Sequence, residues 1–168
     1  MITLAEAIKL KSILRKHISE LEEEIHRVAF TQVEGNATPK KPARSVEVVD
    51  EQLLHIRKEI RTLDRLIYEA NSVETVEIDD EAFTLVEAIE YAIQLRQHVT
   101  LYKQLAVAEP KELNYYSEDN PTYRVALFDP EHYRQQALQF ERKANRLSNA
   151  VNAKNYAVEI DFDGSTYF

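Results

Sequence analysis

The sequence predicts a mainly α-helical protein, an antiparallel four-helix bundle with a coiled-coil-like N-terminal helical hairpin and a small β element. Three observations lead to this prediction. Apolar residues recur at steps of three and four along four long segments, which is the period of an amphipathic helix. A helix-start signal precedes each segment, and only two of the 168 residues are glycine. We expect one helical domain over residues 1–168, because a chain of this length buries roughly 70% of its unfolded surface.

The first predicted helix covers about residues 3–31. Thr3 and Glu6 have the spacing of a capping box at its start. Lys11 is the one charged residue on the apolar seam, a position that in coiled coils sets the register or holds a snorkelling stem. The seam resembles a heptad pattern and consists of Leu4, Ala7, Lys11, Leu14, Ile18, Leu21, Ile25 and Val28.

The second predicted helix covers about residues 50–71, with Asp50 as its N-cap. A long loop with two prolines separates it from the first helix, and residues 45–49 alternate like a short extended piece. The narrow seams and the long loop predict that these two helices form an extended coiled-coil-like hairpin. Residues 73–78 are weakly alternating and β-branched, which indicates a short strand or an extended linker.

The third and fourth predicted helices cover about residues 84–108 and 130–152. Thr84 and Glu87 form a second capping box, while Asp129 and Pro130 give an N-cap and a first helical residue. The third helix is apolar over much of its circumference, which predicts burial against more than one neighbour. Strands are expected at 123–128 and 156–162, and they are expected to pair with each other because an isolated strand leaves its backbone groups unpaired.

Composition and charge exclude several classes of protein. The chain has 21 basic and 29 acidic residues, a net charge of −8, which argues against binding to nucleic acid. It has no cysteine and no glycine-rich loop for phosphate. No segment approaches the roughly 18 apolar residues of a membrane helix, and the first residues lack the pattern of a signal peptide. We therefore expect a cytoplasmic protein that binds neither nucleic acid nor membrane.

Candidate chemistry is sparse. Glu23 and His26 have the Glu-x-x-His spacing of di-iron proteins, but they lie off the seam and no second such pair occurs. The sequence predicts no catalytic residue, no metal and no cofactor. Five polar residues remain as candidates for a ligand pocket at one end of the bundle: Asn71, Arg124, His132, Asn155 and Tyr156. For Asn71 and Asn155, which stand at predicted helix ends, a role as C-caps is the structural alternative.

Several segments match a known family in order and spacing. They include residues 4–8, 32–35, 67–71, 84–85, 101–106 and 149–159. On these segments the chain resembles the septicolysin-like family of bacterial proteins, whose function is not established. Asn155-Tyr156 stands where that family has Asn-Trp. Val73-Glu74 replaces a Thr-Asn pair and residues 122–125 replace an Arg-, Ser- and Glu-rich stretch, so a family site at those positions would be absent here.

The sequence thus predicts a non-catalytic structural or interaction protein that self-associates as a homo-oligomer, with another protein as a further class of partner. Seams, caps and loops account for nearly every residue, which favours this reading over an enzyme. The alternative is a small-ligand-binding protein or an enzyme with a polar pocket at the bundle end. A membrane-active, cytolysin-like protein is a third hypothesis, disfavoured because the chain has no Trp and little β signal.

Overall fold

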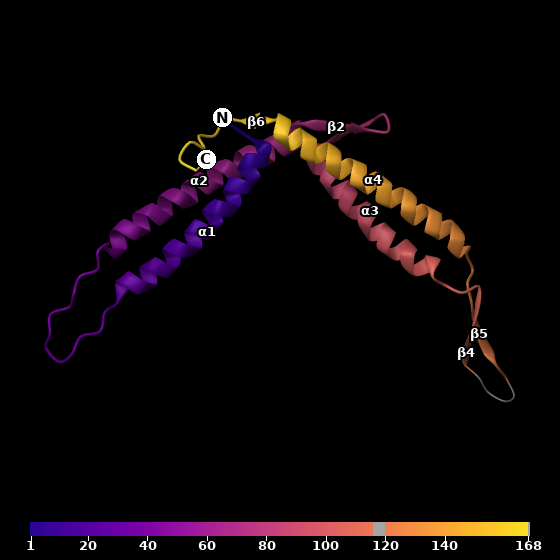
Figure 1. Cartoon of the computed structure of the whole chain (residues 1–168), viewed down its shortest axis with the longest axis horizontal. Coiled ribbons are helices and arrows are strands. Elements are labelled where there is room, and N and C mark those ends of the chain that lie inside the picture. Colours follow the sequence, from indigo (N-terminus) through magenta and orange to yellow (C-terminus); the bar gives the residue numbers. More distant parts are fainter. Residues whose placement is uncertain (116–119, 168) are drawn as a thin grey trace. The chain divides into compact units, whose positions relative to one another are not determined.

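The computed structural model describes residues 1–115 and 120–167, and it is mainly helical (Figure 1). Its helices are α1 (Leu4–Ala29), α2 (Val46–Val73), α3 (Leu85–Ala106) and α4 (Pro130–Ala157). Short strands pair in antiparallel fashion: β1 (Ile2–Thr3) with β6 (Glu159–Ile160), β2 (Thr75–Ile78) with β3 (Glu81–Thr84), and β4 (Lys111–Tyr115) with β5 (Thr122–Val125). The predicted mainly α class, with four helices and small β elements, is confirmed.

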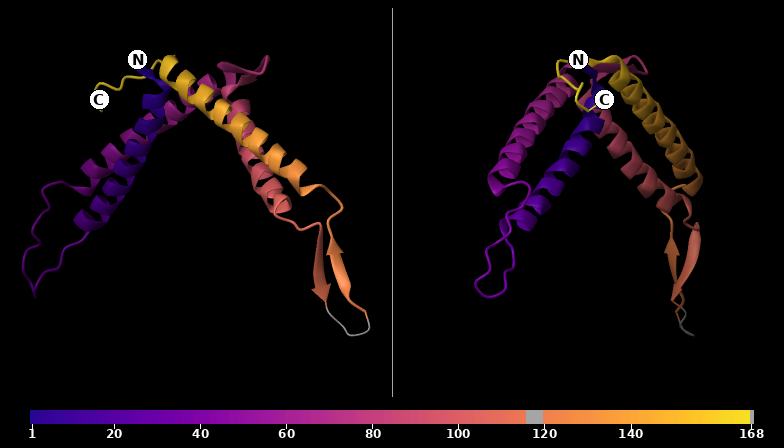
Figure 2. Two further views of the ribbon diagram at one scale, coloured as in Figure 1. Left: turned by 45° about the vertical axis from the view of Figure 1, so that its right-hand side comes forward. Right: turned by 60° about the vertical axis from the view of Figure 1, so that its left-hand side comes forward.

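The chain divides into two compact units. Unit 1 consists of Met1–Val73 and Asn155–Phe168, and unit 2 consists of Glu74–Lys154. Within unit 1, α1 and α2 lie side by side and the β1–β6 pair adjoins them (Figure 2). Within unit 2, α3 and α4 lie side by side, with the β4–β5 hairpin beyond one end of the pair (Figure 2). A single domain over residues 1–168 stays a prediction.

The core of unit 1 includes predicted seam residues and others beside them. Leu14 of the predicted α1 seam is fully buried, and so is Leu10, which lies off that seam. On α2, Leu63 and Val49 are fully buried, and Val49 precedes the helix predicted at 50–71. The seam residue Lys11 forms an ion pair with Asp64 of α2, and its side chain is only 20% exposed. The charged seam position therefore links α1 to α2, as expected for a lysine whose stem packs in the interface and whose ammonium reaches a carboxylate.

The core of unit 2 is aliphatic near the start of α3 and aromatic farther along. Leu85 and Leu147 are fully buried. Farther along, the ring of Tyr102 lies 5.0 Å from that of Tyr133 and 5.4 Å from that of Phe140, measured between centroids. Hydrophobic burial and these ring contacts hold α3 against α4.

Two predicted element boundaries are wrong. Residues 46–49 are not extended, because α2 already begins at Val46. Ser45 explains this start, since its side chain accepts a bond from the backbone N–H of Val48 and its carbonyl accepts one from Val49. Asp50 is thus not the N-cap. At the other boundary, α4 continues to Ala157, so only Glu159–Ile160 of the strand predicted at 156–162 forms a strand.

The predicted pairing between the strands at 123–128 and 156–162 is also wrong. The first of these forms β5 over Thr122–Val125 and pairs with β4, which lies close to it in sequence. The second pairs with β1, where Ile2 is opposite Ile160. The sequence reasoning left out both true partners, since β1 is too short for an alternation signal and β4 lies in a segment taken as a connector.

The two units are built from one repeated pattern that the sequence analysis did not detect. Thr-Leu-Ala-Glu-Ala-Ile at residues 3–8 returns as Thr-Leu-Val-Glu-Ala-Ile at residues 84–89. Each copy has the order strand, helix, helix, strand. Repeat 1 (residues 2–78) contains β1, α1, α2 and β2. Repeat 2 (residues 81–162) contains β3, α3, α4 and β6, with the β4–β5 hairpin inserted between its two helices.

The repeat extends to individual contacts. Both α2 and α4 have 28 residues. The backbone N–H of Leu4 donates to Val158 O at 2.8 Å, and that of Leu85 donates to Glu74 O at the same distance. Buried positions also correspond: Leu4 with Leu85, Ala7 with Ala88, Leu14 with Leu95, Leu53 with Ala137, Leu63 with Leu147, Ile67 with Val151 and Val76 with Ile160.

The repeats exchange their closing strands. β2, the last strand of repeat 1, pairs with β3 of repeat 2, and β6, the last strand of repeat 2, pairs with β1 of repeat 1. The registers correspond, since Ile2 opposite Ile160 matches Phe83 opposite Val76. Each of these two strand pairs therefore needs one strand from each repeat.

Candidate functional site

The five residues predicted to share a pocket lie in different places. His132 is exposed in the first turn of α4, whereas Asn155 and Tyr156 are in its last turn. At about 1.5 Å per residue, His132 and Asn155 lie roughly 35 Å apart along this helix. The structure therefore does not bring these residues into one pocket, because α4 runs unbroken between them.

Asn71 and Asn155 occupy corresponding places in the two repeats. Each lies two residues before the end of its helix, since α2 ends at Val73 and α4 at Ala157. The C-cap alternative is wrong for both, because the helical backbone continues past them. Asn71 and Asn155 are half-buried, and among the described residues the Oδ1 atom of Asn155 is buried without a hydrogen-bond partner. Tyr156, next to it, is 74% exposed.

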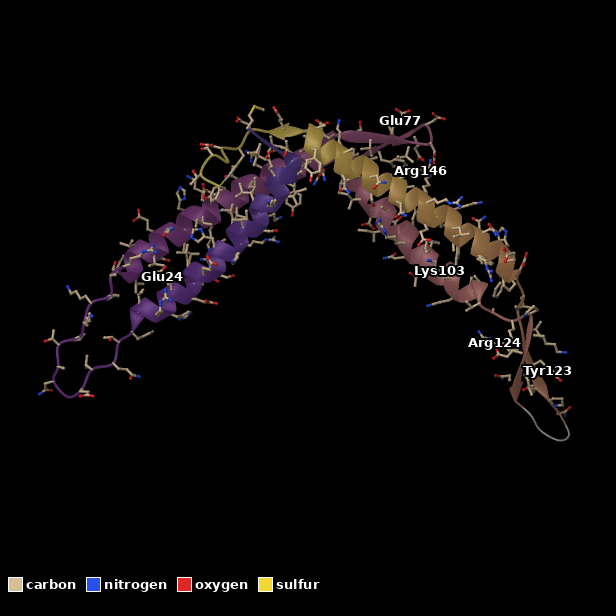
Figure 3. All side chains as sticks on the ribbon, in the orientation of Figure 1. Glu24, Glu77, Lys103, Tyr123, Arg124 and Arg146 are labelled. Carbon is tan, nitrogen blue, oxygen red and sulfur yellow. The ribbon has the colours of Figure 1, made fainter. Side chains whose placement is uncertain are left out.

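Arg124 lies in a cleft within unit 2. The cleft has a volume of about 360 Å³ and is formed by the end of α3, the segment that follows it and the β4–β5 hairpin. Figure 3 shows Arg124 and Tyr123 on this hairpin. Arg124 is opposite Glu112 in the strand register, and across the same hairpin the Lys111 ammonium lies 4.1 Å from the centroid of the Tyr123 ring. Residues lining the cleft include Gln104, Leu105, Glu109, Glu112, Arg124 and Phe128.

The lining of this cleft carries both positive and negative charge. A guanidinium group presents donors that match a carboxylate or a phosphate. Within residues 1–115 and 120–167, Arg124 forms no ion pair within 4.0 Å. Glu109 and Glu112 add negative charge on the same lining. The cleft thus suits a small ligand that carries an anionic and a cationic group.

The pKa shifts in the described residues arise from structural contacts. Hydrogen bonds from Thr3 lower the pKa of Glu6, and bonds from Thr84 lower the pKa of Glu87, in both cases within a capping box. Ser45 lowers the pKa of Glu47 at the start of α2. Backbone and side-chain hydrogen bonds from Ser165 lower the pKa of Asp163.

Tyr167 has a strongly raised pKa. Burial, together with a hydrogen bond to Glu59, raises the pKa of Tyr167 to about 12. Its hydroxyl donates to Glu59 Oε2 at 2.8 Å, which ties the C-terminal segment to α2. In unit 2, Asp79 ties the β2–β3 turn to α4 in a similar way. It accepts two bonds from Arg146 of α4, at 2.7 and 3.0 Å, and lies 3.7 Å from the Lys143 ammonium.

α3 carries an exposed apolar ridge. Val86, Ile89 and Ile93 are 50%, 40% and 43% exposed, although the apolar circumference of this helix predicted their burial. They lie three and four residues apart, so they form one stripe beside the buried seam. An exposed apolar stripe of this kind is typical of an interaction surface.

Over residues 1–115 and 120–167 no three His, Asp or Glu side chains come together as metal ligands. Within the same ranges, no helix has both the length and the apolar character needed to cross a membrane.

Sequence reasoning missed the contacts of Asp79 with Arg146 and of Tyr167 with Glu59. The weakly alternating residues 73–78 are the signal that could have pointed to the first, since they place Asp79 directly after a strand. Nothing in the local sequence around Tyr167 indicates a partner so distant along the chain.

The fold and its exchanged strands define a class of protein, a pair of helical-hairpin repeats with short β pairs. The particular family follows from comparison. The model of DUF6847, a family of unknown function, matches residues 11–160, and the chain belongs to this family.

A solved structure shares the fold. The chain is similar to a functionally unknown conserved protein from Corynebacterium diphtheriae, with 24% identity and a TM-score of 0.64. The match covers 95% of this chain and 99% of that one. No curated protein matches the chain.

Proposed function

We propose that this protein is a non-catalytic interaction protein that self-associates. The observation that carries the proposal is the exchange of closing strands between the repeats. The β1–β6 and β2–β3 pairs each join a strand of repeat 1 to a strand of repeat 2, so the same two pairs can also form between two copies of the chain. Exchange of identical elements is an inexpensive route to a dimer.

Two further observations support this function. The shifted pKa values belong to caps, turns and a tail contact, which are structural roles. Catalytic groups, by contrast, usually have perturbed pKa values inside a cleft. The apolar ridge of Val86, Ile89 and Ile93 gives α3 a surface suited to a protein partner. A cytoplasmic location, the lack of nucleic-acid and membrane partners, and the septicolysin-like resemblance stay predictions.

The test is a measurement of molar mass. Light scattering behind size exclusion, over a series of micromolar concentrations, is expected to give twice the mass of one chain, or more. The measurement is repeated at high salt, because electrostatic association weakens there while strand pairing persists. The mass of a single chain at every concentration would contradict self-association.

A small-ligand-binding protein is the second candidate, and the cleft around Arg124 favours it. The probes are small molecules with a carboxylate and an amino group, followed by calorimetry. The Arg124→Ala variant is expected to bind at least about tenfold more weakly, since a charge-assisted hydrogen bond is lost. Arg134→Ala, at an exposed arginine on α4 outside the cleft, is the matched control and is expected to bind as the unaltered chain does. No binding to the unaltered chain would overturn this candidate.

A further inference from the structure

The two repeats are joined by a strained turn. Asp79 and Asp80 connect β2 to β3, and their φ angles are 55° and 64°. Two residues with left-handed backbone between paired antiparallel strands form a type I′ turn. That turn favours glycine at its second position, because a side chain there is close to the following carbonyl. Asp80 stands at this position, so the closed turn stores backbone strain.

When this turn opens, a second copy of the chain can replace most of the contacts that are lost. If β2, the turn and β3 form one extended segment, repeat 2 separates from repeat 1 of the same chain, and the β2–β3 and β1–β6 pairs within that chain are broken. A second chain in the same state offers a β3 for this β2 and a β6 for this β1, in the same registers. The bonds from Leu4 to Val158 and from Leu85 to Glu74 return as well, because each joins one repeat to the other.

We infer that two copies of this chain form a dimer by exchanging their second repeats, with Asp79 and Asp80 as the hinge. This inference rests on the proposed self-association and names its mode. The driving force is the release of backbone strain at Asp79 and Asp80, since short connections under strain favour exchange. The ion pairs of Asp79 with Arg146 and Lys143 hold the turn closed. They involve partly exposed groups, so salt weakens them and speeds the exchange.

A disulfide test reads the exchange directly, because the chain has no native cysteine. Ile2 and Ile160 are opposite each other in the β1–β6 register. Antiparallel partners have Cα atoms about 4.5–5.5 Å apart, a separation that a disulfide can span. The full chain with Ile2→Cys and Ile160→Cys is oxidised and separated without reductant. The exchanged dimer gives a covalent dimer, whereas a closed chain gives a monomer with an internal disulfide.

Single-cysteine chains provide the control. Ile2→Cys and Ile160→Cys chains, one of them carrying a size tag, are mixed at high salt and then oxidised. Exchange brings Ile2→Cys of one chain to Ile160→Cys of the other, so the mixed disulfide is expected. Either chain alone is expected to give little covalent dimer, because in both forms β1 pairs with β6 and not with another β1.

The hinge variants test the cause. Asp80→Gly creates Asp-Gly, a preferred type I′ pair, and keeps the contacts of Asp79. It is expected to raise the dissociation constant of the dimer at least about fivefold. Asp80→Val places a β-branched residue where the backbone is left-handed, and it is expected to increase the dimer fraction. Circular dichroism confirms that each variant is folded.

The outcomes separate the two proposals. A dimer with interchain disulfides that Asp80→Gly weakens supports the exchange. A dimer whose disulfides form only within chains overturns the exchange and leaves self-association in place. A monomer for the unaltered chain and for Asp80→Val overturns both.

Discussion

Thr3 and Thr84 show at the residue scale how the same local signal starts both repeats. The side chain of each threonine accepts a bond from the backbone N–H of a glutamate three residues later, at 3.2 Å for Glu6 and 3.3 Å for Glu87. Each glutamate in turn accepts a bond from the threonine backbone, at 2.8 and 2.9 Å. Both capping boxes were predicted from sequence and are confirmed, because a capping box depends only on residues close along the chain.

We predict that Thr3→Ala and Thr84→Ala destabilise the protein by similar amounts. Loss of an N-cap side chain lowers the free energy of unfolding by about 1 kcal/mol. Urea unfolding followed by circular dichroism measures it. The matched controls are Thr62→Ala and Thr100→Ala, whose hydroxyls bond to carbonyls within helices and whose replacement by alanine is expected to cost nothing. A cap variant as stable as its control would refute the equivalence.

The capping boxes also depend on pH. The folded state lowers the pKa of Glu6 and Glu87, so their contribution is fully present above the pKa of the unfolded chain. It is lost as the pH falls through the lowered folded-state values. The difference between the unaltered chain and each cap variant is therefore expected to shrink in acid.

At the scale of elements, the C-terminal segment is bound to α2 through side-chain contacts, and the β2–β3 turn is bound to α4 in a corresponding way. Lys143 of α4 corresponds in the repeat to Glu59 of α2. Lys143 lies beside Asp79 in the turn, whereas Glu59 accepts the bond from Tyr167 in the tail. Both repeats thus fasten the segment after the closing strand to the second helix, with different chemistry.

We predict that Tyr167→Phe lowers the free energy of unfolding by about 1 kcal/mol, since it deletes one hydrogen bond. Because the folded pKa of Tyr167 is raised to about 12, this stabilisation is present below pH 10 and is lost as the pH rises toward 12. Urea unfolding at neutral and alkaline pH measures both effects. Tyr156→Phe, at an exposed tyrosine, is the control and is expected to be neutral. A constant difference up to pH 12 would contradict the assigned contact.

At the scale of the whole molecule, local and long-range features differ in how well they could be predicted. The helices, their seams and the Asp129 N-cap follow from neighbouring residues, and Glu131 N–H does donate to Asp129 Oδ1 at 3.0 Å. The start of α2 was misplaced because Ser45 and Asp50 are both good N-caps and the sequence does not rank them. The partner of β6 was wrong because its pair with β1 joins segments far apart in the chain, and the partner of β5 was wrong because β4, although close by, lies in a segment taken as a connector.

The candidate site was predictable only in part. Arg124 does line a cleft, but Asn155 belongs to the opposite end of α4 from His132. Their separation depends on how far α4 continues, and Asn152, taken as its end, is instead an ordinary helical residue. The repeat was visible in the two Thr-Leu-x-Glu-Ala-Ile segments. Recognising it would have paired Asn71 with Asn155 and would have set both apart from His132.

The exchanged strands also set the order of folding. Ile2 and Ile160 pair across almost the whole chain, and contacts so distant in sequence form slowly because a large loop must close first. The β2–β3 pair closes through two residues and can form early. During synthesis, repeat 1 is therefore made first, but unit 1 is completed last, because its β1–β6 pair can form only after β6 has been made.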